Sequence, residues 1–166
     1  MKQVAAIFVV SAVALAAIGT YLVSKGGGGV ETEGNAPNFT LTDTDNDTFS
    51  LHDFRGNVVL LNMMATWCPA CVQEISYLTD AQQHYGGNVI ILSISVGGDS
   101  NEMLKNFKTE KGATWRFAVD TDNVLVKYEV DKIPKLVLID KNENVRFTHV
   151  GVTPSSDLIT EIDGLL

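Results

Sequence analysis

The sequence has very little cysteine: only Cys68 and Cys71 occur, and both lie in one four-residue window. A structural disulfide usually closes a much longer loop, because the entropic gain grows with loop length. A tetrahedral zinc site would need two more ligands, yet His52, His84 and His149 form no pair at metal-ligand spacing. By elimination, we predict that the cysteines are reactive rather than structural, and we expect no metal and no cofactor.

The sequence also lacks any surplus of basic residues. Its net charge is -8, and the part after residue 35 carries 10 Lys and Arg against 18 Asp and Glu. Phosphate binding needs a basic face, so this acidic body argues against nucleic acid as a partner. Otherwise the charge indicates only a well-solvated surface.

Charge is absent altogether between Lys2 and Lys25, where an apolar run continues to Val23. About 20 apolar residues are enough to span a bilayer. The alternative is a signal peptide cleaved at the small residues 14–16, but the apolar run extends past that point. We therefore predict a membrane anchor over residues 1–25.

The glycines at positions 26–29 open a segment without apolar periodicity, which predicts a flexible Gly-rich linker over residues 26–35. The remaining domain, residues 36–166, would then be exported, whether the anchor is kept or cleaved. Disulfides form and persist outside the cytoplasm. The predicted location is the cell membrane, with a single pass and an extracytoplasmic carboxy-terminal domain.

Strand and helix patterns alternate along this domain. Strands are predicted at 39–41, 49–51, 58–64, 89–96, 117–119, 136–139 and 145–149, and helices at 70–84, from 99 or 100 onward, at 121–128 and from 154 onward. In the second helix Met103, Leu104 and Phe107 are predicted to form the inner face. This order predicts an α/β body with a mixed sheet.

The cysteine motif Cys68-Pro69-Ala70-Cys71 falls at the start of a helix that follows a buried strand. The amino terminus of a helix stabilises a thiolate, which is the nucleophilic form of cysteine. Pro69 suits the first helical position because it needs no N–H donor there. We predict that Cys68 is the exposed attacking thiol and that Cys71 resolves the mixed disulfide.

Residues 60–74, LLNMMATWCPACVQE, resemble the active-site segment of the TlpA/ResA-type thioredoxin-like proteins, approximately LNFWATWCPPCxxE. The segment 36–41 resembles their opening strand, Ile133-Pro134 their cis-proline loop, and Gly151 their glycine before the last helix. The resemblance implies a thioredoxin-like fold, in which a central mixed β-sheet is flanked by helices and preceded here by an amino-terminal transmembrane helix.

The resemblance also implies roles for single residues. Cys68 would be the nucleophile and Cys71 the resolving thiol, while Glu74 matches an acid that tunes proton transfer beside the cysteine pair. The residues alone leave a simpler role open, in which Glu74 only complements the helix amino terminus. Trp67 and Pro69 would contact substrate beside the motif, although simple core packing of Trp67 is the alternative.

The resemblance further implies that Pro134 is cis and faces Cys68. The backbone of Ile133 would then be free to pair with an extended substrate. The sequence departs from the family pattern at several positions: Met63-Met64 replaces an aromatic pair, Ala70 and Ser76 stand in place of prolines, and Lys135 replaces a small hydroxyl residue. These changes bear on redox potential and substrate choice rather than on the type of reaction.

Proteins of this type usually reduce disulfides of exported proteins and receive electrons from a membrane thiol donor. Some keep apocytochrome c reduced for haem attachment. Two other functions stay open: a peroxiredoxin-like peroxidase, which would need Ser or Thr where Ala65 stands, and a copper carrier using Cys68, Cys71 and His149. The sequence does not set the direction of electron flow.

Overall fold

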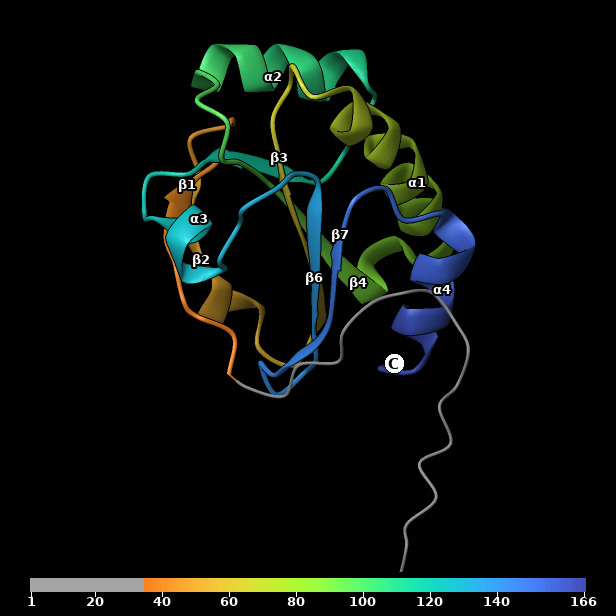
Figure 1. The fold of residues 1–166 in the computed structure, drawn as a ribbon. Helices are drawn as coiled ribbons and strands as arrows, with labels where there is room; N and C mark the ends of the chain where they lie inside the picture. The colour runs from red at the N-terminus through yellow and green to blue at the C-terminus, as the bar shows by residue number, and fades with distance from the viewer. Residues whose placement is uncertain (1–34) are drawn as a thin grey trace, which may run out of the picture.

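The computed structural model describes residues 35–166, which form a two-stranded hairpin and a five-stranded sheet (Figure 1). The predicted anchor and all but the last residue of the predicted linker lie outside the described residues. Within residues 35–166, no helix is both long and apolar enough to cross a membrane.

The elements follow the predicted order closely. The strands are β1 (Thr40–Thr42), β2 (Thr48–Ser50), β3 (Val58–Met64), β4 (Val89–Ser95), β5 (Arg116–Val119), β6 (Lys135–Ile139) and β7 (Val145–Val150). The α-helices are α1 (Pro69–Tyr85), α2 (Asn101–Glu110), α3 (Val124–Lys127) and α4 (Ser155–Asp163), and the 3-10 helices are η1 (Leu51–Phe54) and η2 (Gly86–Asn88).

The main sheet has the strand order β5-β4-β3-β6-β7. Strands β3, β4 and β5 are parallel, whereas β6 runs antiparallel to β3 and β7 antiparallel to β6. The mixed sheet predicted from the order of elements is therefore confirmed. Because β3 lies in the middle, both of its faces are covered, which explains its uninterrupted apolar sequence.

Alternate residues of β3 belong to two separate apolar cores. Val58, Leu60 and Met64 pack in one core with residues of α1, α2 and α4. Val59, Leu61 and Met63 pack in the other core with residues of the β1–β2 hairpin and α3. Figure 1 shows α1 and α4 on one side of the sheet and α3 with the hairpin on the other.

One prediction for α2 is wrong. Leu104 and Phe107 are buried as predicted, but the side chain of Met103 is 51% exposed. The helix begins one turn earlier than Leu104, with Ser100 as its N-cap accepting the Met103 N–H at 3.2 Å. This start places Met103 in the first turn of α2, while Leu104 and Phe107 carry the buried side of the helix.

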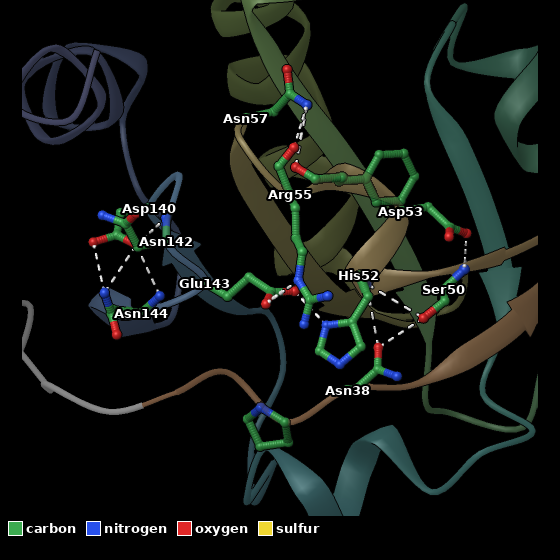
Figure 2. Close-up of polar contacts among 12 residues, drawn as sticks. Asn38, Ser50, His52, Asp53, Arg55, Asn57, Asp140, Asn142, Glu143 and Asn144 are labelled. Carbon is green, nitrogen blue, oxygen red and sulfur yellow. Dashed lines mark hydrogen bonds and ion pairs between the residues drawn. The ribbon is translucent and has the colours of Figure 1, made fainter.

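A polar cluster ties η1 to the β6–β7 turn at the end of the sheet remote from the cysteines (Figure 2). Glu143 is bonded by His52 Nδ1 at one carboxylate oxygen and by Arg55 Nε, at 2.6 Å, at the other. Asp140 caps the same turn by accepting the N–H groups of Asn142 and Asn144, both at 2.9 Å. These contacts stabilise the end of the sheet that is remote from the cysteines. The cysteine motif lies at the opposite end, after the carboxyl end of β3.

Candidate active site

The cysteine motif lies where β3 ends and α1 begins. Cys68 is the N-cap of α1, and its Sγ accepts the backbone N–H of Cys71 at 3.3 Å. Pro69 occupies the first turn, where no N–H donor is required. The amino terminus of a helix favours negative charge, and the Cys68 sulfur lies at this end of α1.

Both cysteines are reduced, and they differ in access to solvent. Cys71 is fully buried and Cys68 is 6% exposed. Cys68 is thus the more accessible thiol, but our prediction of an exposed Cys68 is wrong in degree. The loop before β6 covers it: the Cys68 Sγ lies 3.9 Å from the carbonyl oxygen of Ile133.

This covering loop contains the Ile133-Pro134 peptide bond, which is cis as the resemblance implied. The Pro134 carbonyl accepts the N–H of Gly151 at 2.8 Å, which fixes the loop to the end of β7. The paired part of β6 starts only at Lys135. Ile133 therefore lies just outside the sheet pairing and directly against Cys68.

Cys71 is strongly shifted toward its protonated form. Burial raises the pKa of its thiol to about 12, and the hydrogen bond with Cys68 and the nearby charge of Glu74 act in the same direction. A thiol with this pKa does not ionise unaided near neutral pH. Resolution by Cys71 therefore needs a neighbouring group that accepts its proton.

Glu74 is the carboxylate whose charge influences the pKa of Cys71. It lies one turn after Cys71 on the same face of α1 and is fully buried. The Thr153 N–H donates to its Oε2 at 2.8 Å, whereas Oε1 has no hydrogen-bond partner. Burial raises the pKa of Glu74 to about 7, although the Thr153 hydrogen bond lowers it. Because the carboxylate faces the core rather than the helix end, the simple helix-terminus role does not fit.

Trp67 is not a core residue. Its side chain is 65% exposed, and its indole Nε1 donates to the carbonyl of Gly97 at 3.1 Å. A Cβ on Gly97 would lie 3.2 Å from the indole and only 2.4 Å from the Cβ of Ala65. The loop after β4 therefore packs closely under the Ala65–Trp67 turn and holds an exposed aromatic ring beside the cysteines.

Sequence reasoning missed the part that Asp99 plays in this arrangement. Asp99 is 4% exposed and directly precedes Ser100, the N-cap of α2. Its carboxylate accepts the Thr66 N–H at 2.9 Å, the Thr66 hydroxyl at 2.5 Å and the Ser95 hydroxyl at 2.6 Å. The sequence feature that could have indicated this role is the position of Asp99 just after β4. Because β4 ends beside β3, residues that follow β4 lie near the turn that leads to the cysteines.

The described residues give the copper-carrier alternative no ligand set. No group of three or more His, Cys, Asp or Glu side chains within residues 35–166 could hold a metal ion. His149 lies in β7, and its ring is stacked on Phe147 with the centroids 6.2 Å apart. For the peroxidase alternative, Ala65 supplies no hydroxyl and is fully buried.

The fold and the paired thiols at the start of α1 define the class of protein, a thiol–disulfide oxidoreductase with a thioredoxin-like fold. The chain belongs to the Redoxin family, whose model matches residues 32–165.

Similar proteins are named as thiol–disulfide oxidoreductases. It is 33% identical to the thiol-disulfide oxidoreductase ResA of Geobacillus kaustophilus (strain HTA426), over 78% of this chain and 75% of that protein. It is 34% identical to ResA of Bacillus subtilis (strain 168), over 67% of this chain and 63% of that protein. The fold matches a thiol:disulfide interchange protein from Chlorobium tepidum TLS, with TM-score 0.74 and 23% identity over 81% of this chain and 97% of that one.

Proposed function

We propose that this oxidoreductase reduces disulfides of exported proteins, with Cys68 attacking and Cys71 resolving. The observation that carries the exchange chemistry is the pair of thiols at the start of α1: Cys68 is the N-cap and the more accessible of the two, and Cys71 is fully buried one turn further on. The proposed direction follows from the resemblance of residues 60–74 to the TlpA/ResA-type proteins, which usually act as reductants.

The reaction proceeds in two exchanges. The Cys68 thiolate attacks one sulfur of the substrate disulfide; that S–S bond breaks, and the departing sulfur leaves as a thiolate that takes up a proton. The Glu74 carboxylate then accepts the proton of Cys71. The Cys71 thiolate attacks the Cys68 sulfur, a Cys68–Cys71 disulfide forms, and the second substrate sulfur leaves. The substrate gains two electrons and the enzyme loses two.

Substrate would contact the surface around Cys68. Trp67 offers an exposed ring beside the motif, and Ile133 lies before the paired part of β6, within 3.9 Å of the Cys68 Sγ. An extended segment on Ile133 would bring its disulfide to Cys68, with Pro69 and Pro134 on either side. This arrangement suits a segment without fixed structure, and the CxxCH region of apocytochrome c is a substrate of that chemistry.

The enzyme must be reduced again after each turnover. We propose a membrane thiol donor, together with a location at the outer face of the cell membrane through the anchor predicted over residues 1–25. Support comes from the uncharged apolar run between Lys2 and Lys25. Fractionation of cells that produce the full chain tests the location, since a protein found in the cytoplasm would contradict it.

Trapping tests the mechanism. A Cys71→Ala variant incubated with oxidised exported proteins should accumulate mixed disulfides through Cys68, because the resolving thiol is missing. The matched Cys68→Ala variant should accumulate none. If Cys71→Ala traps nothing, the proposed roles are wrong.

The redox potential tests the direction. Equilibration with glutathione should give a potential at or below that of thioredoxin, about -270 mV, whereas a value near the -120 mV of a strong oxidant would overturn the reductase proposal.

A further inference from the structure

Two anchors from the loop after β4 hold two consecutive residues of the turn that leads to Cys68. Thr66 is bonded to the Asp99 carboxylate through both its backbone N–H and its hydroxyl. Trp67 is bonded to the Gly97 carbonyl through its indole N–H. An exposed indole held by a single hydrogen bond would ordinarily rotate among several rotamers. The bonds from Asp99 to Thr66 fix the backbone next to Trp67 and are therefore needed to keep the ring in one place.

Asp99 also shapes the loop that carries Gly97. The Ser95 hydroxyl donates to Asp99 Oδ2 at 2.6 Å, which joins the end of β4 to the residue before the N-cap of α2. This bond closes the loop of residues 95–99, with the Gly97 carbonyl directed at Trp67. One carboxylate thus fixes both the backbone that carries Trp67 and the acceptor that holds its ring.

We propose that Asp99 is a positioning residue that holds the Trp67 indole as a preformed contact surface for the polypeptide substrate beside Cys68. This inference rests on the proposed substrate contact of Trp67. A large apolar ring fixed before binding costs little entropy when substrate arrives, so it strengthens binding. The contribution of Asp99 should therefore fall on KM more than on kcat.

The hydrogen-bond geometry distinguishes a positioning role from a role of the negative charge. In an Asp99→Asn variant, the amide oxygen can take the place of Oδ2 and accept from the Thr66 N–H and the Ser95 hydroxyl. The amide nitrogen then faces the Thr66 hydroxyl, which can act as acceptor. All three contacts survive without the charge. An Asp99→Ala variant loses all three.

The experiment measures reduction of a model peptide with one internal disulfide. Asp99→Ala should raise KM about tenfold, equivalent to about 1.4 kcal/mol, with a much smaller change in kcat. Asp99→Asn should restore KM to within about twofold of the original. In Asp99→Ala, fluorescence anisotropy decay should show faster motion of the iodide-accessible indole, which is Trp67 because Trp115 is buried.

A double-mutant cycle with Trp67→Ala tests the coupling. If Asp99 acts through Trp67, the double variant should have nearly the KM of Trp67→Ala alone. Additive effects, or an Asp99→Ala variant with unchanged KM, would overturn the inference. If Trp67→Ala itself leaves KM unchanged, the proposed substrate contact of Trp67 fails instead.

Two further variants test whether a general loss of structure explains the rise in KM of Asp99→Ala. Thr66→Val keeps the shape of Thr66 and loses only the 2.5 Å hydroxyl bond, so it should raise KM by part of the Asp99→Ala effect. Asp140→Ala removes a carboxylate that also accepts backbone N–H groups, but at the remote end of the sheet (Figure 2). It should lower stability without changing KM. An equal rise in KM for Asp140→Ala would show that the effect is only structural.

Discussion

The backbone N–H of Thr153 donates a 2.8 Å hydrogen bond to the carboxylate of Glu74, although the two residues are 79 positions apart. Both residues are buried. The loop before α4 thereby contacts the carboxylate, and the Glu74 side chain has no exposure to solvent. One hydrogen bond does not compensate for the lost hydration, so burial still raises the pKa of Glu74 to about 7.

The raised pKa of Glu74 predicts a pH-dependent stability. In the folded state the carboxyl group keeps its proton up to about pH 7, whereas an unfolded glutamate loses it near its ordinary pKa. The unfolded state therefore binds fewer protons between these values, and stability falls as pH rises. The stabilisation is complete below the unfolded pKa and is lost through pH 7, a difference of about 3 kcal/mol.

Urea unfolding of the reduced protein at a series of pH values between 4 and 8 measures this loss. Glu74→Gln is the matched variant, since it keeps the shape and cannot ionise. The decline with pH should be smaller in Glu74→Gln by about 3 kcal/mol. Identical pH profiles for the two proteins would show that Glu74 does not titrate as its burial requires.

The same residue should control the resolution step. When DTNB reacts with Cys68, attack by Cys71 on the resulting mixed disulfide releases a second TNB anion, and Cys71 must lose its proton first. In the wild type this second release should accelerate through about pH 7 as Glu74 becomes a carboxylate. Glu74→Gln should slow it at neutral pH by about 10²-fold, the lower range for a missing general base.

Stopped-flow absorbance separates the two releases. The first release reports attack by Cys68 and serves as the internal control for Glu74→Gln. If the second release keeps its rate and its pH profile in the variant, Glu74 does not accept the proton of Cys71.

A third prediction concerns the close contact between Gly97 and Ala65. An added Cβ at Gly97 would lie 2.4 Å from the Ala65 Cβ, so one of the two loops must move. Gly97→Ala should destabilise the fold by about 1–3 kcal/mol, the usual cost of overpacking, and should displace the indole of Trp67.

Thermal unfolding and tryptophan fluorescence measure both effects. Gly87→Ala is the control, because a Cβ there has no atom within 4 Å. It should be close to neutral. A Gly97→Ala variant as stable as Gly87→Ala would contradict the prediction, because it would mean that the loop after β4 moves aside with no loss of stability.

Local patterns in the sequence were enough to predict most of the fold. The apolar run 58–64 and the change to helical spacing after Pro69 predicted β3 and α1, because these signals depend on neighbours along the chain. The position of Cys68 at the start of a helix followed directly from them. The cis bond at Pro134 came only from the resemblance, since few X–Pro bonds are cis in folded proteins.

Features that depend on contacts between distant segments were not predictable in this way. The position of Asp99 just after β4 places it near the end of β3, but no local pattern identifies Thr66, 33 positions earlier, as the partner of its carboxylate. The low exposure of Cys68 depends on a loop 65 positions away, and the burial of Glu74 depends on Thr153. In each case the sequence identified the residue type, and the packing of remote loops decided its environment.

The last prediction concerns Lys135, which replaces the small hydroxyl residue common in the family. Its ammonium group donates to the carbonyls of Tyr128 at 2.8 Å and Glu129 at 2.9 Å, which fixes the chain between α3 and β6. This segment includes Ile133, the residue that lies against Cys68. Lys135→Thr keeps a good strand former but removes both bonds, so the segment should become more mobile.

Hydrogen exchange should therefore show faster exchange of the amides between Tyr128 and Ile133, and unfolding should show a loss of about 1 kcal/mol. Lys127→Thr is the control, because Lys127 instead bonds Asn38 and Asp122. It should leave the exchange rate of Ile133 unchanged. If Lys135→Thr also leaves that rate unchanged, the loop is held by the Gly151–Pro134 bond alone, and Lys135 has no part in presenting Ile133 to substrate.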